Sequence, residues 1–190
     1  IPPWGGTQAL FGTNPIAFSA PRVDDAPMVI DMSLSKVARG KVMLANQQNE
    51  KIPEDWAIDN EGKPTTDPKK ALAGAMLPIG DAKGSALALM VEILAAGLTG
   101  SNFGFEASSF LDAEGDSPGV GQLIIAIDPS FFSGDDFAER IETIISSILE
   151  QPSTRLPGSK RLEKRKVREK SEKITISKEL YEKIKALTKS

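Results

Sequence analysis

Ser85-Ala-Leu-Ala-Leu-Met-Val-Glu-Ile-Leu-Ala-Ala-Gly-Leu-Thr99 is the stretch that decides the fold class. It predicts a helix, because Ser85 can cap its start and Gly100 can end it. Its apolar residues lie almost all round the expected helix, and such a helix is normally buried. The rest of the chain must therefore supply a core around this helix.

A second apolar run, residues 122–128, is rich in β-branched residues and predicts a central strand. Shorter extended segments are expected at residues 16–19, 28–31 and 174–176, with a turn over 22–27 and a long loop over 101–120. Further helices are expected at 36–48, 68–73, 137–150 and 178–188, capped by Ser35, Asp67, Asp135 or Asp136, and Ser177. The strands do not follow a regular βαβ order, so the fold class is α/β or α+β.

The chain of 190 residues contains no histidine and no cysteine. This excludes Ser-His-Asp and Cys-His nucleophiles, disulfides, and the ordinary zinc sites built from His and Cys. The Rossmann and Walker A glycine patterns are also absent from the sequence. We therefore expect no metal, and no histidine or cysteine of this chain to act in catalysis.

Charge divides the chain into two parts. Residues 1–154 carry 10 basic and 21 acidic side chains (net −11), whereas residues 155–190 carry 13 basic and 5 acidic ones (net +8). A basic segment can bind nucleic acid, but this one offers only Tyr181 for stacking on bases, so we expect no nucleic-acid partner. No apolar run approaches the roughly 20 residues that span a bilayer, so we expect no membrane partner. The division predicts a core domain, 1–154, and a basic C-terminal segment, 155–190.

A glycine-rich turn precedes the apolar helix and is the first candidate ligand site. Leu77-Pro-Ile-Gly80-Asp-Ala-Lys83-Gly84 combines glycines, a lysine and a helix start. Such an arrangement favours a phosphate or carboxylate, because unpaired N–H groups and the positive end of the helix dipole lie there. The alternative is a structural turn with a solvent-exposed lysine.

Three other segments carry candidate ligand-binding groups. Asp31 and Ser33 end an extended segment and could bind ribose hydroxyls, or Asp31 could be a structural cap. Arg39 could hold a carboxylate, or it could belong to a charged helix surface. Residues 155–161 form a Pro-Gly turn flanked by cations that could hold a phosphate, or they could simply begin the charged tail.

The combination of motifs is more specific than any one of them. In order, they are Gly12-Thr13-Asn14-Pro15-Ile16-Ala17, Asp31-Met32-Ser33 with Val37-Ala38-Arg39-Gly40, Ile52-Pro53-Glu54-Asp55-Trp56-Ala57, Thr65-Thr66-Asp67-Pro68, Leu77-Pro-Ile-Gly with Lys83-Gly84, Ala126-Ile127-Asp128-Pro129, and Leu156-Pro157-Gly158. From Pro2 to about Arg161 this series resembles the malate/L-lactate dehydrogenase family that is distinct from the Rossmann lactate dehydrogenases.

The resemblance implies an oxidoreductase that transfers a hydride between NAD(H) or NADP(H) and a small 2-hydroxy acid or 2-oxo acid. Cyclic imino acid reduction is the alternative within the family, and a nucleotide-binding module without activity is a further one. The implied fold is a non-Rossmann, mixed and largely antiparallel sheet wrapped by helices. The implied protein is a cytoplasmic homodimer.

The resemblance also assigns roles to individual residues. Thr13 and Arg39 correspond to substrate contacts. Cofactor contacts correspond to Asp31, Met32, Ser33, Ala82, Lys83, Gly84, Arg155, Pro157, Gly158, Ser159 and Arg161. The acid/base histidine of the family lies in an N-terminal part of the same enzyme, which is therefore an expected partner of these 190 residues.

Two positions depart from the family pattern. Ala82 stands where many members have histidine, which removes a side-chain hydrogen bond to the cofactor. Lys41 stands where an acidic residue is expected in the imine-reducing branch, and this favours the 2-hydroxy acid branch. The cations of residues 155–161 favour NADP over NAD, because a 2′-phosphate binds to positive charge.

Overall fold

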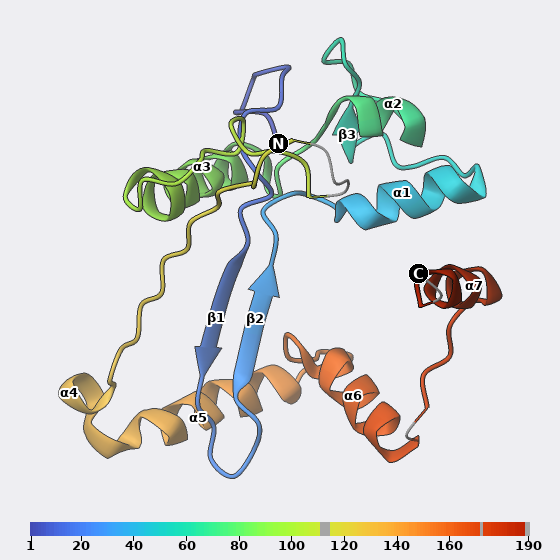
Figure 1. Ribbon diagram of the computed structural model, residues 1–190. Helices are drawn as coiled ribbons and strands as arrows, with labels where there is room; N and C mark the ends of the chain where they lie inside the picture. Colours follow the sequence, from blue (N-terminus) through green and yellow to red (C-terminus); the bar gives the residue numbers. More distant parts are fainter. Residues whose placement is uncertain (111–114, 172, 189–190) are drawn as a thin grey trace. The chain divides into compact units, whose positions relative to one another are not determined.

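The computed structural model describes residues 1–110, 115–171 and 173–188 (Figure 1). The chain divides into two compact units: the first comprises Ile1–Phe18 and Ile30–Asp135, and the second comprises Ser19–Val29 and Asp136–Ser190. The expected division after residue 154 is defined by charge and by expected ligand contacts, not by compactness, and it stays a prediction.

Short antiparallel strands alternate with helices. β1 (Ile16–Ala20) and β2 (Met28–Met32) form a hairpin whose arrows run in opposite directions in Figure 1, which confirms both extended segments. β3 (Ala57–Ile58) pairs antiparallel with β4 (Ala75–Met76). The mixed fold with antiparallel pairing is therefore as expected, while the larger sheet wrapped by helices stays a prediction.

Helices make up most of the remaining regular structure. They are α1 (Arg39–Gln48), α2 (Pro68–Ala73), α3 (Asp81–Val91), the π-helix η1 (Glu92–Gly97), α4 (Ser130–Ser133), the 3-10 turn η2 (Gly134–Asp136), α5 (Phe137–Leu149), α6 (Ser159–Ser171) and α7 (Lys178–Leu187). Two caps are confirmed by their hydrogen bonds. The Asp67 carboxylate accepts from Lys69 N at 2.9 Å, and the Ser177 hydroxyl accepts from Leu180 N at 3.2 Å.

Two helix starts differ from the prediction because the expected capping serines are used elsewhere. The Ser35 hydroxyl donates to the Val37 carbonyl at 2.8 Å, and α1 begins only at Arg39. The Ser85 hydroxyl accepts from Trp4 N at 2.8 Å, and α3 begins four residues earlier than expected, at Asp81. The Ser85 partner could not be assigned from sequence, because Trp4 is distant in the chain, whereas Ser35 bonds locally, two residues ahead.

The apolar helix is buried on one face rather than all round. Gly84, Ser85, Ala88, Glu92 and Ala96 are buried, whereas Leu98 is 68% exposed. The other large apolar side chains that are exposed on this helix are Leu87, Leu89, Met90 and Ile93. The described residues pack against the helix face that carries small side chains, and these large side chains remain exposed to solvent.

Two predicted strands are wrong. Residues 122–128 and 174–176 form no strand in the described part of the chain, and Ile124 is 85% exposed. A strand requires a neighbouring strand for its backbone hydrogen bonds, and the described residues provide none beside these segments.

The apolar pattern of α5 also buries only Ile145. Of the expected loop over 101–120, residues 111–114 lie outside the described residues.

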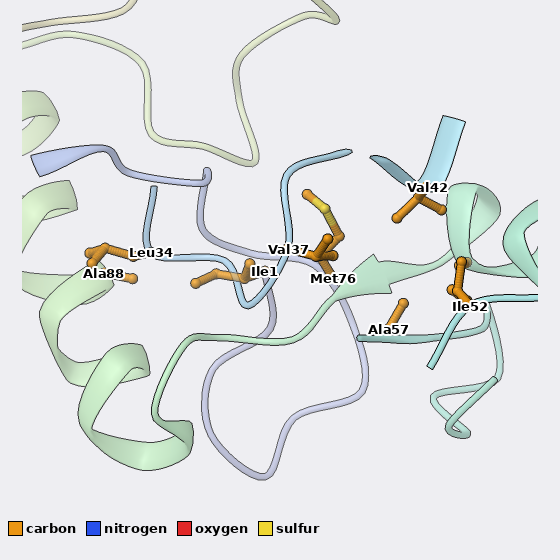
Figure 2. Packing of buried hydrophobic residues seen from close by; sticks show 9 residues of the cluster. Ile1, Leu34, Val37, Val42, Ile52, Ala57, Met76 and Ala88 are labelled. Carbon is orange, nitrogen blue, oxygen red and sulfur yellow. The ribbon is translucent and has the colours of Figure 1, made fainter. Parts of the chain in front are cut away.

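The hydrophobic core lies in the first compact unit. Figure 2 shows members contributed by the N-terminal segment, by the segment before α1, by α1 itself, by β3 and β4, and by α3. The buried members are Ile1, Leu34, Val37, Val42, Ile52, Ala57, Ala71, Met76 and Ala88. Among the described residues, no helix is long and apolar enough to cross a membrane.

Candidate functional site

A short backbone ladder joins three of the predicted ligand-binding segments. Leu34 N donates to the Thr13 carbonyl at 2.7 Å, and Ile79 N donates to the Leu34 carbonyl at 2.8 Å. Lys36 N then donates to the Leu77 carbonyl at 2.7 Å. Thr13, the Asp31-Met32-Ser33 segment and the turn before Lys83 are thereby brought together in the first compact unit, although they are far apart in sequence.

The Asp31-Met32-Ser33 segment consists of the last two residues of β2 and the residue that follows the strand. Asp31 and Met32 are exposed, and Ser33 is half-buried with its hydroxyl 3.1 Å from the Ser35 hydroxyl. A carboxylate and a hydroxyl at the end of a strand can bind vicinal hydroxyls, as on a ribose. The geometry is therefore compatible with the role that the sequence assigned to this segment.

The turn before α3 is left-handed at two consecutive residues. Gly80 has φ 60° and Asp81 has φ 55°, and together they reverse the chain into the helix. Ala82 and Lys83 are exposed in the first helical turn. Lys83 is the cation that this turn supplies, and Asp81 places a negative charge beside it.

Gly84 is required for packing at the start of α3. Its backbone is buried against Ile79, and a Cβ atom added there would lie 1.5 Å from the Ile79 carbonyl oxygen. The lack of a side chain lets α3 pack against the segment that carries the backbone ladder. The cofactor contact assigned to Gly84 stays a prediction.

Lys36 forms an ion pair at the edge of this site. Its ammonium lies 2.9 Å from a carboxylate oxygen of Asp55. This hydrogen bond raises the pKa of Lys36 and lowers the pKa of Asp55. The Lys36 ammonium is therefore already paired with Asp55, and Lys83 is the better candidate to bind an incoming anion.

Arg39 is tied to α2. Its Nη2 donates to the Leu72 carbonyl at 3.1 Å, and its Nε is buried without an acceptor among the described residues. A half-buried guanidinium that lacks a carboxylate partner is costly unless an anion joins it. This arrangement is compatible with a residue that binds a carboxylate, and the substrate contact of Arg39 stays a prediction.

A basic turn, defined as residues 155–161, lies in the second compact unit at the start of α6. Gly158 has φ 77°, and its carbonyl accepts from Arg161 N at 2.9 Å and Leu162 N at 3.0 Å. Arg155 and Pro157 are exposed, Ser159 is half-buried, and the first turn of α6 has no acidic residue. A positive helix start of this kind matches the chemistry of a phosphate group.

The structure also reveals polar groups that sequence reasoning missed. The Glu92 carboxylate is buried and accepts from Gly12 N at 3.0 Å and from Asn14 Nδ2 at 2.9 Å. Both donors flank Thr13. The sequence signal for this group is a single glutamate inside an otherwise apolar helix.

The predicted segments carry groups of the kind that contact a phosphorylated dinucleotide. Acidic and hydroxyl groups for ribose and cations for phosphate occur within the predicted segments. Within the described ranges, no group of three or more His, Cys, Asp or Glu side chains could hold a metal ion.

Comparison with known proteins gives consistent relatives. The chain is 56% identical over 97% of its length to a (2R)-3-sulfolactate dehydrogenase (NADP(+)) of Chromohalobacter salexigens, and it covers 54% of that protein. It is 44% identical over 97% of its length to a Delta(1)-pyrroline-2-carboxylate reductase of Burkholderia ambifaria, again covering 54% of it.

Solved structures agree in fold. The crystal structure of delta1-piperideine-2-carboxylate reductase from Pseudomonas syringae matches with a TM-score of 0.87 at 42% identity, over 98% of this chain and 56% of that one. Sulfolactate dehydrogenase from Methanocaldococcus jannaschii matches with a TM-score of 0.81 at 36% identity, over 96% and 53%.

The chain spans about half the length of the curated relatives it matches. The sequence model of the malate/L-lactate dehydrogenase family matches residues 1–185, nearly the whole chain. The chain belongs to the malate/L-lactate dehydrogenase family.

Proposed function

We propose that this chain is the cofactor-holding part of an NADP(H)-dependent oxidoreductase that acts on a small 2-hydroxy acid or 2-oxo acid of the sulfolactate type. The observation that carries the proposal is the 56% identity to a sulfolactate dehydrogenase that uses NADP(+), against 44% to the imine reductases. The reaction would move a hydride between the nicotinamide ring and C2 of the substrate, and the cofactor supplies that hydride chemistry.

Candidate cofactor contacts occur within each compact unit taken by itself. Asp31 and Ser33 would accept and donate hydrogen bonds to ribose hydroxyls, beside the exposed Met32. Lys83 would neutralise a phosphate at the first turn of α3, where Ala82 and Gly84 contribute backbone and packing. The remaining contacts would come from the basic turn, namely Arg155, Pro157, Gly158, Ser159 and Arg161. Its cations suit the 2′-phosphate that distinguishes NADP from NAD.

The substrate contacts would lie in the first compact unit. Arg39 would hold the carboxylate, because its guanidinium has no anionic partner among the described residues and cannot lose its charge. Thr13 would contact the substrate from the loop that the backbone ladder supports. The family resemblance implies a histidine as the proton donor to the C2 oxygen, and because these 190 residues contain none, the proton would come from another part of the enzyme.

Reduction of a cyclic imino acid is the second candidate. It is favoured by the match to delta1-piperideine-2-carboxylate reductase at a TM-score of 0.87. Lys41, exposed in α1, points away from this candidate, because an acidic residue is expected there in the imine-reducing branch. A nucleotide-binding module without turnover is a third outcome that the same experiments would detect.

Partners of the same enzyme would cover the open apolar surfaces. The large side chains on α3 and the exposed run that includes Ile124 and Ile127 are unusual for a protein surface. A second subunit of a homodimer, or the N-terminal part of the same enzyme, would bury them. A cytoplasmic location stays an expectation from the family.

Fluorescence titration of the intact protein with NADPH and NADH tests the cofactor assignment. We expect saturable binding of both, with NADPH bound more tightly. Absence of saturable binding for either nucleotide would overturn the proposed function. Binding without turnover of any 2-oxo acid or imine would favour the module without activity.

A further inference from the structure

Glu92 is a buried acid at the first position of η1. The residue is 6% exposed, and no lysine or arginine of the described residues forms an ion pair with it, while the N-terminal ammonium of Ile1 interacts with it electrostatically. Burying a carboxylate is costly unless N–H donors replace its water shell. The donors around Glu92 are therefore the key to its role.

Both carboxylate oxygens accept hydrogen bonds from loops that are distant in sequence. Oε1 accepts from Gly12 N at 3.0 Å and from Asn14 Nδ2 at 2.9 Å. Oε2 accepts from Gly104 N at 3.0 Å. One acid thus joins the loop before β1 to the loop after η1.

The donors are themselves held in unusual positions. Asn14 has a left-handed φ of 42°, and its Nδ2 also donates to the Ala88 carbonyl at 2.8 Å. At Gly104 an added Cβ atom would lie 2.2 Å from Gly12 N, so the two backbones approach as closely as glycine permits. A charge-assisted set of hydrogen bonds is strong enough to hold such a loop.

Thr13 lies between the two residues that Glu92 holds. Its carbonyl accepts from Leu34 N at 2.7 Å, which ties the other side of the same loop to the backbone ladder. Thr13 is therefore held from both sides: by Glu92 through Gly12 and Asn14, and by Leu34 directly. The π-helical turn is consistent with this role, because π turns often occur at functional sites.

We propose that Glu92 is a positioning residue for the substrate contact made by Thr13. It touches neither substrate nor cofactor in this account, and it acts by holding residues 12–14 against the turn at Gly104. The inference rests on the proposed function, because Thr13 is a substrate contact only in that context. Its structural part, the holding of the loop, can be tested without substrate.

The test compares three variants of the intact protein. Glu92→Ala removes both acceptors, whereas Glu92→Gln keeps one carbonyl oxygen for Gly12 and Asn14. Glu106→Gln is the matched control, because the exposed Glu106 also accepts a backbone N–H, from Phe103 at 2.9 Å, in the same loop. Thermal unfolding of each variant establishes that it is folded.

Two measurements then separate the two parts of the inference. Amide hydrogen exchange should accelerate at Gly12 and Gly104 in Glu92→Ala and remain unchanged in Glu106→Gln. In steady-state kinetics, Glu92→Ala should raise the KM for the 2-oxo acid about tenfold, with the KM for NADPH unchanged. Glu92→Gln should recover a substantial part of that loss.

Each contrary result overturns one part of the inference. Unchanged exchange in Glu92→Ala would show that the carboxylate does not hold the loop. Faster exchange with an unchanged KM for the 2-oxo acid would show that the held loop does not serve the substrate. A parallel fall in kcat for all substrates, without a KM change, would indicate a structural role only. If the wild-type enzyme bound NADPH but turned over no substrate, the proposed function would fail, whatever the exchange data showed.

Discussion

The backbone N–H of Leu34 donates a 2.7 Å hydrogen bond to the carbonyl of Thr13. Leu34 directly follows the predicted ribose-binding segment, and Thr13 is a predicted substrate contact. The carbonyl of Leu34 in turn accepts from Ile79 N, next to the turn that leads to Lys83. Three weak sequence signals are thus parts of one hydrogen-bonded arrangement in the first compact unit.

Gly84→Ala should destabilise the protein strongly. The new Cβ would overlap the Ile79 carbonyl oxygen at 1.5 Å, and both groups are backbone that cannot rotate away. We expect the free energy of unfolding to fall by about 3 kcal/mol or more. Gly40→Ala is the control, because its Cβ meets nothing within 4 Å in α1. That variant should gain up to about 1 kcal/mol from helix propensity. Urea unfolding measures both, and equal effects would contradict the packing role of Gly84.

Lys83→Ala should weaken cofactor binding without loss of stability. Lys83 is exposed in the first turn of α3, so its removal leaves no cavity. We expect the Kd for both NADPH and NADH to rise roughly three- to tenfold, because both cofactors carry the pyrophosphate. Lys69→Ala removes an exposed lysine from α2 and should leave both Kd values unchanged. An unchanged Kd in Lys83→Ala would refute the phosphate contact.

Arg155→Ala and Arg161→Ala should lower the preference for NADPH. We expect the Kd for NADPH to rise about tenfold, and that for NADH less than about twofold, because only NADPH carries the 2′-phosphate. Arg168→Ala, in the last turn of α6, provides the control at the same net charge. An equal rise in the Kd for both cofactors would instead place these arginines at the pyrophosphate. No rise in either Kd would place them at no phosphate at all.

The Arg22–Glu142 pair should make the second compact unit sensitive to acid. Arg22 Nε and Nη2 donate to the two oxygens of Glu142, each at 2.9 Å. The hydrogen bond from Arg22 lowers the pKa of Glu142 below its ordinary value of 4.5. A lowered pKa means that the pair stabilises the fold above about pH 4.5 and that this contribution disappears as pH falls through the lowered value.

Urea unfolding of wild type and Glu142→Gln at about pH 7 and about pH 3 measures that contribution. The difference in stability between the two proteins should be present at neutral pH and should shrink in acid. A difference that stays constant across this range would show that the ion pair does not contribute through the charge of Glu142.

Local features of the fold could be predicted from sequence. Asp67 and Ser177 cap their helices through hydrogen bonds within three residues, so the sequence contains all the information that those caps need. The hairpin of β1 and β2 was also predictable, because its strands are adjacent in sequence and separated by a turn.

Features that depend on distant partners could not be predicted. Ser85 resembles a cap, but Trp4 N, far earlier in the chain, uses its hydroxyl. The run containing Ile124 has the composition of a strand, but composition does not reveal whether a neighbouring strand exists. Glu92 was missed for the same reason, because its three donors lie on two loops that only the fold brings together.

The central claim is that this chain serves NADPH-dependent reduction of a sulfonated 2-oxo acid. The most direct measurement is the kcat/KM of the intact protein with NADPH for 3-sulfopyruvate, the 2-oxo acid formed by oxidising C2 of 3-sulfolactate, and for Δ1-pyrroline-2-carboxylate. We predict NADPH oxidation with a higher kcat/KM for 3-sulfopyruvate. Preference for the imine, or turnover of neither compound, would contradict it.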